Sequence, residues 1–348
     1  MTTKRRFPGI SARTYQHPAD RAALAAMRKV PGFDFVLRKM IGTVGERSLR
    51  LAFLASSVRV NERQFPDLWA SYLEACEILD MDPPPLFVAQ TPFVNAGAIG
   101  VDEPFIVLNS GMLTLLDDAE LQCVLGHELG HVQSDHVLYK TMVRLLLRLS
   151  IVAFSIPVGG MALYAITTAL LEWDRKSELS ADRAGLLVCQ DVDVAMRVDM
   201  KLAGGGNTDQ MNVDEFLLQA EEYRAGGTVV DSVLKLFRLL ARTHPFPVLR
   251  LAELKKWTDA GEYDRILGGD YALREEDDGI SVYDEVVESG STYAEDVAGS
   301  PDPLFRLMRD IGTGLGAAAT TVSGAAGNAA EGARSWLRRN RGSDQPPG

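Results

Sequence analysis

Apolar residues recur at three- and four-residue spacing through most of residues 20–260, which is the pattern of helices that bury one face. Ahead of a proline stop at Pro83-Pro84-Pro85, this spacing predicts helices at residues 22–29, 33–41, 48–58 and 66–79. The spacing resumes at Met112 and predicts further helices over residues 172–189, 192–203, 213–223, 229–241 and 248–260. The chain should therefore be mainly α-helical.

Between the two helical sections lie short apolar runs that are typical of strands. They cover residues 86–88, 98–100 and 105–108, and a turn through residues 102–104 joins the last two. Asn95 leads into the middle run. A small β-sheet among many helices predicts an α+β fold that is mainly α-helical.

One predicted helix carries a motif with metal-binding chemistry. Asp117 and Glu120 form a capping box at its start, and H-E-x-x-H follows with His127, Glu128 and His131. Histidines four residues apart lie about 40° apart around a helix, so both imidazoles can reach a single zinc ion. Glu128 projects beside them, where it can accept a proton from the attacking water. The motif therefore predicts that this helix forms one wall of a hydrolytic metal site.

A third ligand is needed, because zinc in hydrolytic sites takes three protein ligands and leaves one position open. Glu178 and Asp182 are four residues apart on a later predicted helix, which places both carboxylates on one face. Glu178 can bind the metal while Asp182 fixes the ring of a ligand histidine, for which His127 is favoured. A solvated helix face is the alternative for such a pair.

His136 is a less suitable third ligand. Five residues beyond His131, it would be rotated by about 140° on a continuing helix. The extended motif with a third histidine after x-x-G-x-x is also absent, since Ser134 and Val137 occupy those places. We expect His136 to support the fold or a nearby polar network.

Residues 141–173 are very apolar, and no charged residue falls between Leu149 and Leu171. Such a run is long enough to span a bilayer, but one span would separate H-E-x-x-H from Glu178. Pro157-Val158-Gly159-Gly160 also breaks the run. We therefore expect a helical hairpin with arms near residues 141–156 and 161–173. The hairpin is either buried, packed on a partner, or in peripheral contact with a membrane interface, with a true membrane span as the remaining alternative.

Composition narrows the classes of protein. A hydrophobic content of 46% and a charged content of 24% are ordinary for a globular chain. The net charge of −11 argues against a nucleic-acid partner. The 3 cysteines are widely spaced and are expected to be free, buried thiols in a reducing compartment. No apolar segment follows the basic N-terminus, so we expect a cytoplasmic protein whose membrane association depends on the hairpin.

Four segments are expected along the chain. They are a polar surface arm at residues 1–19, a folded domain at 20–270 that contains the hairpin, an acidic segment at 271–310 and a tail at 311–348. The tail is rich in Gly, Ala, Thr and Ser and has few large apolar residues. It is therefore expected to be disordered.

Several short motifs occur together in a consistent order and spacing. They are Asn95-Ala96, His127-Glu128-Leu129-Gly130-His131, residues 178–185, and Thr243-His244-Pro245. Over about residues 65–260 the chain resembles the HtpX-like zinc metallopeptidases, peptidase family 48 of the gluzincin group, which are related to the CAAX prenyl proteases. The resemblance implies a zincin-like catalytic domain with one zinc ion per chain. It also implies endopeptidase activity on peptide or unfolded protein substrates, often in protein quality control.

The resemblance implies roles for two further residues. Asn95 precedes the strand that such enzymes use as an edge, where an extended peptide can add by β-augmentation; a lone asparagine would otherwise be a turn residue. His244 would approach the site and donate to the oxyanion, whereas by itself it would be a loop histidine before a proline.

The expected function is a zinc-dependent endopeptidase with His127, His131 and Glu178 as ligands and Glu128 as general base. One alternative is a zinc-retaining, chaperone-like module without proteolytic activity, against which Glu128 argues because a structural site has no use for that carboxylate. The other is a membrane-associated interaction scaffold in which the motif is accidental. The sequence indicates neither the oligomeric state nor the physiological substrate and its cleavage preference.

Overall fold

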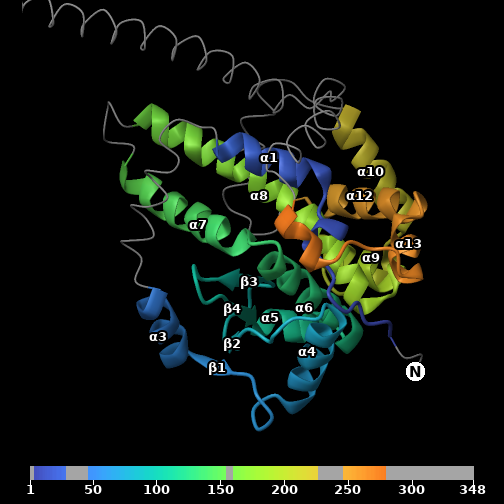
Figure 1. Cartoon of the computed structure of the whole chain (residues 1–348), viewed down its shortest axis with the longest axis horizontal. Coiled ribbons are helices and arrows are strands. Elements are labelled where there is room, and N and C mark those ends of the chain that lie inside the picture. Colours follow the sequence, from blue (N-terminus) through green and yellow to red (C-terminus); the bar gives the residue numbers. More distant parts are fainter. Residues whose placement is uncertain (1–3, 29–45, 154–159, 226–245, 280–348) are drawn as a thin grey trace, which may run out of the picture.

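A computed structural model describes residues 4–28, 46–153, 160–225 and 246–279 (Figure 1). The helices predicted at residues 33–41 and 229–241 lie outside these ranges. His244, most of the acidic segment and the tail lie outside them as well.

Helices make up most of the described structure. They are α1 (Pro18–Arg28), α3 (Glu46–Ser56), α4 (Pro66–Ile78), α5 (Ser110–Leu115), α6 (Asp118–Gln133), α7 (His136–Ala153), α8 (Gly160–Cys189), α9 (Val192–Gly204), α10 (Val213–Ala225), α12 (Pro247–Asp259) and α13 (Glu262–Gly268). Short 3₁₀ turns occur at residues 12–14, 208–210 and 274–279. This content confirms the mainly helical class that the spacing of apolar residues predicted.

One small mixed sheet accompanies the helices, with strand order β1-β2-β4-β3. Its strands are β1 (Ser57–Arg59), β2 (Leu86–Ala89), β3 (Ala96–Ile99) and β4 (Phe105–Asn109). β2 and β4 run parallel, whereas β1 and β3 each pair antiparallel with their neighbour. β3 forms an edge of the sheet and contacts both α6 and α7. The α+β class is thereby confirmed, with the sheet beside the helix that carries H-E-x-x-H.

Strand β1 corrects one prediction, since residues 48–58 were expected to form a single helix. Helix α3 ends at Ser56, and Val58 then pairs with Val88 of β2. A β-branched residue fits a strand when a partner strand is available, and that partner comes from a distant part of the sequence. β3 likewise begins at Ala96, earlier than the expected start at residue 98.

Helices α6 and α8 pack closely because small residues line their contact. A Cβ on Gly126 would lie 2.5 Å from the Cβ of Val188, and one on Gly130 would lie 2.5 Å from the Cβ of Ala184. No side chain larger than hydrogen fits at either glycine without a shift. The close approach brings the H-E-x-x-H helix against the helix that carries Glu178.

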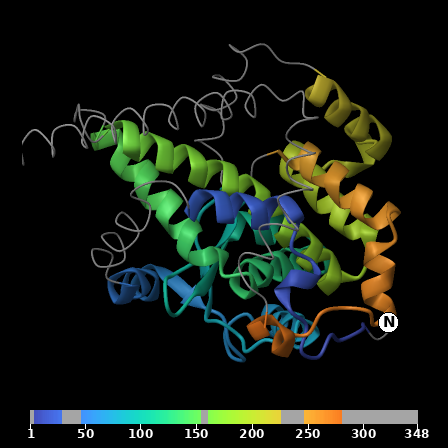
Figure 2. The same cartoon turned by 45° about the horizontal axis from the view of Figure 1, so that its top comes forward.

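The expected hairpin is present as α7 and α8, which contact each other and run side by side in both views (Figures 1 and 2). The second arm is longer than expected, because α8 extends without a break from Gly160 through Glu178 to Cys189. Within the described ranges, no helix combines the length and the apolar character needed to cross a membrane.

The N-terminal segment corrects another expectation, because it is not a surface arm. Phe7, Ile10 and Tyr15 are fully buried in the main hydrophobic core. Ile10 also forms a bridge with Leu273, which belongs to the segment expected to be separate from the domain. Isolated apolar residues in a polar stretch show no periodicity, yet each such burial contributes about 1.5–3 kcal/mol. The folded part of the chain therefore extends beyond the expected boundaries at both ends.

Candidate metal centre

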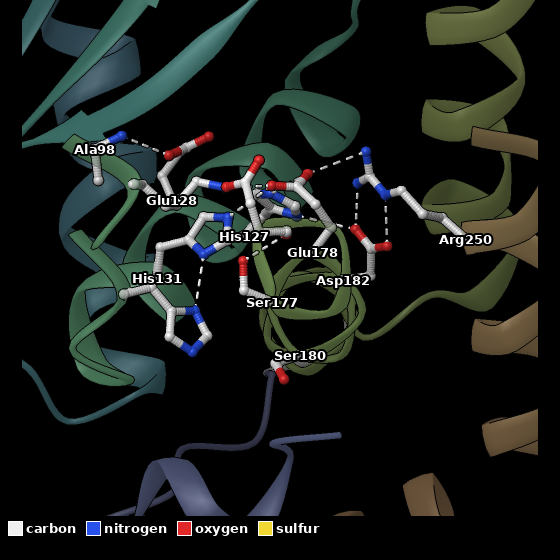
Figure 3. A network of polar contacts seen from close by, with 12 residues as sticks. Ala98, His127, Glu128, His131, Ser177, Glu178, Ser180, Asp182 and Arg250 are labelled. Atoms are coloured by element: carbon white, nitrogen blue, oxygen red, sulfur yellow. Dashed lines mark hydrogen bonds and ion pairs between the residues drawn. The ribbon is translucent and has the colours of Figure 1, made fainter. Parts of the chain in front are cut away.

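The two histidines of H-E-x-x-H lie on the face of α6 that is covered by α8. The predicted capping box opens α6: the Glu120 backbone N–H donates to Asp117 at 2.9 Å, and the Glu120 carboxylate accepts from the Asp117 N–H at 2.9 Å. The rings of His127 and His131 have centroids 4.8 Å apart, and both residues are buried. Their Nε2 atoms point toward the same place (Figure 3).

Glu178 of α8 completes a compact group of possible metal ligands with His127 and His131. Its Oε1 lies 3.3 Å from Nε2 of His131, and its Oε2 lies 3.6 Å from Nε2 of His127. Tetrahedral ligands at metal distances of about 2.0–2.2 Å are themselves about 3.3–3.6 Å apart. The geometry of this group therefore fits a small divalent cation.

The chemistry of the group also fits a metal. Nε2 of His131 is buried and has no hydrogen-bond partner among the described residues. Burial and the nearby Lys140 ammonium hold the pKa of His131 well below its ordinary value. A neutral imidazole with an unused lone pair beside a buried carboxylate is what a bound cation requires.

Asp182 contacts the histidine that the sequence favoured. Its Oδ1 lies 2.9 Å from Nδ1 of His127. Burial raises the pKa of Asp182, but the Arg250 guanidinium and hydrogen bonds from Arg250 and His127 outweigh burial and hold it below its ordinary value. The carboxylate therefore stays ionised and accepts the Nδ1 proton, which leaves Nε2 of His127 as the candidate ligand atom.

Two buried cations that the sequence did not single out flank the carboxylates. Lys140 of α7 donates to Oε1 of Glu178 at 2.5 Å and to Asp174 at 2.7 Å. Arg250 of α12 donates through Nε to Asp182 at 2.7 Å, and its Nη1 lies 3.4 Å from Oε2 of Glu178. Neither residue belongs to a spaced motif, so only tertiary packing reveals them.

Glu128 lies beside the ligand group and outside it. Its Oε2 accepts a hydrogen bond of 2.7 Å from the Ala98 backbone N–H of β3, while Oε1 is buried without a hydrogen-bond partner among the described residues. The carboxylate thus stands between the ligand group and the edge of the sheet (Figure 3). One oxygen is anchored, and the other is available for chemistry.

Asn95 directly precedes edge strand β3 and is half-buried. Its carbonyl accepts from the Asn109 N–H at 3.0 Å, which fixes the start of the strand. Further along, the Ala98 carbonyl accepts from Arg144 of α7 at 2.9 Å. The expected substrate role of Asn95 stays a prediction, as does the expected donation from His244 to the oxyanion.

A small hollow, partly open to solvent, adjoins His127 and Glu128. Its walls are mostly apolar and come from α5, α6, α8, α9 and α12, including Met112, Val124, Val198, Leu202 and Leu254. Asp199 and Arg250 lie at its polar end, and burial raises the pKa of Asp199 well above its ordinary value. The candidate metal site therefore adjoins a small, largely apolar surface.

Curated relatives share much of this chain. Plastoglobule-localized metallopeptidase 48, chloroplastic, of Arabidopsis thaliana is 37% identical over 267 residues, which cover 75% of this chain and 77% of the relative. Protease HtpX homolog 2 of Methanosarcina acetivorans is 26% identical over 222 residues, which cover 57% of this chain and 74% of the relative. A protease HtpX homolog of Tropheryma whipplei (strain Twist) is 33% identical over 97 residues, which cover 27% of this chain and 33% of the relative. No solved structure matches the chain.

The family model of peptidase family M48 matches residues 62–258, the region that contains the ligand group, Glu128 and the edge strand. This match covers more than half of the chain, and the relatives carry the names of metallopeptidases and proteases. The chain therefore belongs to peptidase family M48 and is an HtpX-like metallopeptidase, as the motifs in its sequence predicted.

Proposed function

We propose that this protein is a zinc-dependent endopeptidase that holds one zinc ion through His127, His131 and Glu178. The observation that carries the proposal is the buried group of three ligand atoms within 4.8 Å of one another, contributed by two tightly packed helices. Two imidazoles and one carboxylate, with a fourth position left open, are the ligands typical of hydrolytic zinc.

Glu128 is the general base in this proposal. When bound at these ligands, zinc polarises the scissile carbonyl and activates the attacking water. Glu128 Oε1 accepts the proton of that water and then passes a proton to the departing amine. The Ala98 N–H holds Oε2 and keeps the carboxylate turned toward the reacting groups. His244 is proposed to donate to the oxyanion, on the strength of the family motif alone.

The substrate is proposed to be an extended peptide or an unfolded protein. β3 is an edge strand and lies next to Glu128, so a peptide lying beside it would pass the reacting groups. The Ala98 N–H and carbonyl bond Glu128 and Arg144, so the peptide would pair with other backbone groups of the strand. Asn95 at the start of β3 is proposed to contact that peptide. The adjoining hollow would take an apolar side chain, because its walls are largely apolar. Extended segments with apolar side chains are exposed in misfolded proteins, which supports a role in protein quality control.

The test compares wild type with Glu128→Gln, measuring zinc content by elemental analysis and cleavage of unfolded casein. We expect equal zinc content, with turnover reduced by about 10²–10⁴-fold in the variant and abolished by a chelator in wild type. Asp118→Asn, an exposed change on the same helix, serves as the control and should behave as wild type. Retained turnover in zinc-loaded Glu128→Gln would overturn the mechanism. Stoichiometric zinc without cleavage in wild type would favour the chaperone-like module.

We also propose a cytoplasmic location with peripheral membrane contact through residues 141–173. The support is the uncharged sequence between Leu149 and Leu171, which includes the end of α7 and the start of α8. Cell fractionation followed by a high-salt wash tests it. Protein that stays in the membrane fraction after the wash supports apolar contact, and protein found only in the soluble fraction contradicts it.

A further inference from the structure

A chain of buried polar groups leads from His131 away from the ligand group and ends on α1. Nδ1 of His131 lies 3.0 Å from Nδ1 of His136, the first residue of α7. Nε2 of His136 lies 3.0 Å from Oδ2 of Asp20 in the first turn of α1. His131, His136 and Asp20 are each at most 1% exposed, so solvent does not interrupt the chain.

Only one arrangement of protons satisfies this chain while His131 remains a metal ligand. The lone pair on Nε2 of His131 requires the proton to sit on Nδ1, from which it is donated to Nδ1 of His136. His136 must then carry its own proton on Nε2 and donate it to Asp20. In this arrangement each tautomer is fixed by its neighbour.

Asp20 is itself held in place by α8. The Ser180 hydroxyl donates to Oδ2 of Asp20 at 2.6 Å, and the His17 backbone N–H donates to the Ser180 oxygen at 2.9 Å. Ser180 lies on the side of α8 turned away from Glu178 (Figure 3). One helix therefore carries Glu178 on one side and the support for Asp20 on the other.

The two ligand histidines are supported in parallel ways. His127 donates directly to Asp182, which Arg250 holds, whereas His131 reaches a carboxylate only through the ring of His136. The packing around His136 fits this role, because its ring lies edge-on to Trp173 with centroids 5.4 Å apart. A ring that has a polar partner at both nitrogens and packs against Trp173 keeps its neighbour in one orientation.

We propose that Asp20 and His136 are positioning residues that fix the ring and tautomer of His131, so that α1 is part of the working metal centre. This inference rests on the proposed zinc site. Asp20 precedes residues 62–258, the region that matches the peptidase family model, and nothing in the H-E-x-x-H motif points to it. The competing explanation is that Asp20 stabilises α1 alone, since an acidic residue in the first turn favours any helix.

Zinc affinity, measured by chelator competition on the full chain, separates the two explanations. We expect Asp20→Ala and His136→Phe each to bind zinc about 10–100-fold more weakly than wild type, the usual effect of losing a group that orients a ligand. Phenylalanine retains a ring against Trp173. The visible spectrum of the cobalt-substituted protein should change in both variants, because it reports on the geometry of the ligands.

A double variant tests whether Asp20 acts through His136. If it does, Asp20→Ala should cause no further loss of zinc affinity in the His136→Phe background. Ala23→Gly is the matched control, because Ala23 is buried in α1 but lies outside the polar chain. This control should lower the melting temperature while leaving zinc affinity and the cobalt spectrum as in wild type.

Wild-type zinc affinity in Asp20→Ala, or equal losses in the two backgrounds, would overturn the inference. If Asp20→Ala does not fold, Asp20→Asn replaces it, since its amide oxygen still accepts from His136. Its loss of affinity should then be smaller and should again vanish in the His136→Phe background; a loss that persists there contradicts the inference. A wild-type protein that binds no zinc would instead refute the proposed function.

Discussion

Both oxygens of Glu178 face a buried cation, Lys140 on one side and Arg250 on the other. Burial lowers the pKa of Lys140, but Asp174 and Glu178 outweigh burial and raise it above its ordinary value. Removing the cation that pairs with a buried carboxylate is strongly destabilising, because the carboxylate would remain charged in a poorly solvated place.

Lys140→Met should therefore lower the free energy of unfolding of the metal-free protein by about 3–5 kcal/mol, since it leaves Asp174 and Glu178 without their shared cation. Denaturant unfolding measures this loss. Lys255→Met is the matched control, because Lys255 pairs with Asp259 on the surface and such a pair contributes about 0.3–0.5 kcal/mol. Similar losses in both variants would show that the Lys140 pairing contributes little.

The histidines predict how stability depends on pH in the metal-free protein. Burial and Lys140 lower the pKa of His131 well below 6.5, and burial lowers that of His17 as well. As pH falls below about 6.5 the unfolded chain gains a proton that the folded protein does not take up. Stability is then full above this pH and falls below it, by about 1.4 kcal/mol per pH unit for each such histidine.

His131→Gln should remove one part of this slope and leave the part due to His17. Chemical unfolding of chelator-treated protein at several pH values between 7 and 5 provides the measurement. Parallel profiles for wild type and His131→Gln would contradict a depressed pKa at His131.

The spacing of residues within single helices predicted much of the candidate site. His127 with His131, and Glu178 with Asp182, are pairs four residues apart, and helix geometry alone puts each pair on one face. Asp20, Lys140 and Arg250 carry no such spacing. They reach the site from other helices, and their burial follows from packing that the sequence does not display.

At the scale of elements, the contact between α6 and α8 determines the separation of the proposed ligands. His127 and His131 come from α6, and Glu178 comes from α8, so any displacement of one helix moves the ligands apart. The contact depends on glycines that a sequence pattern treats only as poor helix formers. These glycines matter because they let α6 and α8 pack closely.

Gly126→Ala should weaken both the fold and metal binding. The new Cβ would lie 2.5 Å from the Cβ of Val188, and relief of this clash is expected to cost about 1–3 kcal/mol and to shift α8. Thermal unfolding and zinc affinity measure the two effects. Gly268→Ala is the control, because nothing lies within 4 Å of the position where its Cβ would be, so stability should be unchanged or slightly higher. Val188→Gly in the Gly126→Ala background removes the Cβ that makes the closest contact and should restore part of the zinc affinity.

Elements that depend on distant partners were the ones that sequence reasoning missed. β1 forms because β2 offers an unpaired edge, although residues 48–58 have a helical spacing. The N-terminal segment is buried because α4 and residues 271–274 provide its surroundings, as in the hydrogen bond from the Phe7 N–H to the Ile78 carbonyl. The spacing of apolar residues along the chain indicates neither the strand pairing of β1 nor the burial of the N-terminal segment.

At the scale of the whole molecule, backbone hydrogen bonds join the two ends of the described chain. The Ser11 N–H donates to the Ala272 carbonyl at 2.9 Å, and the Arg274 N–H donates to the Gly9 carbonyl at 2.8 Å. The first residues thus pair with the last ones while their apolar side chains enter the core. The same segment leads directly into α1 and Asp20, so its anchoring also bears on the metal centre.

Ile10→Ala tests whether this segment belongs to the core. Ile10 is fully buried, and truncation of such a side chain is expected to cost about 2–5 kcal/mol, whereas Leu218→Ala, at a residue 50% exposed, should stay within about 0.5 kcal/mol of wild type. Denaturant unfolding of the two variants gives the comparison. If Ile10→Ala were as mild as Leu218→Ala, residues 4–17 would be the surface arm that their polar sequence predicts. A large loss would make the N-terminal segment a part of the peptidase fold, as the burial of Phe7 and Tyr15 requires.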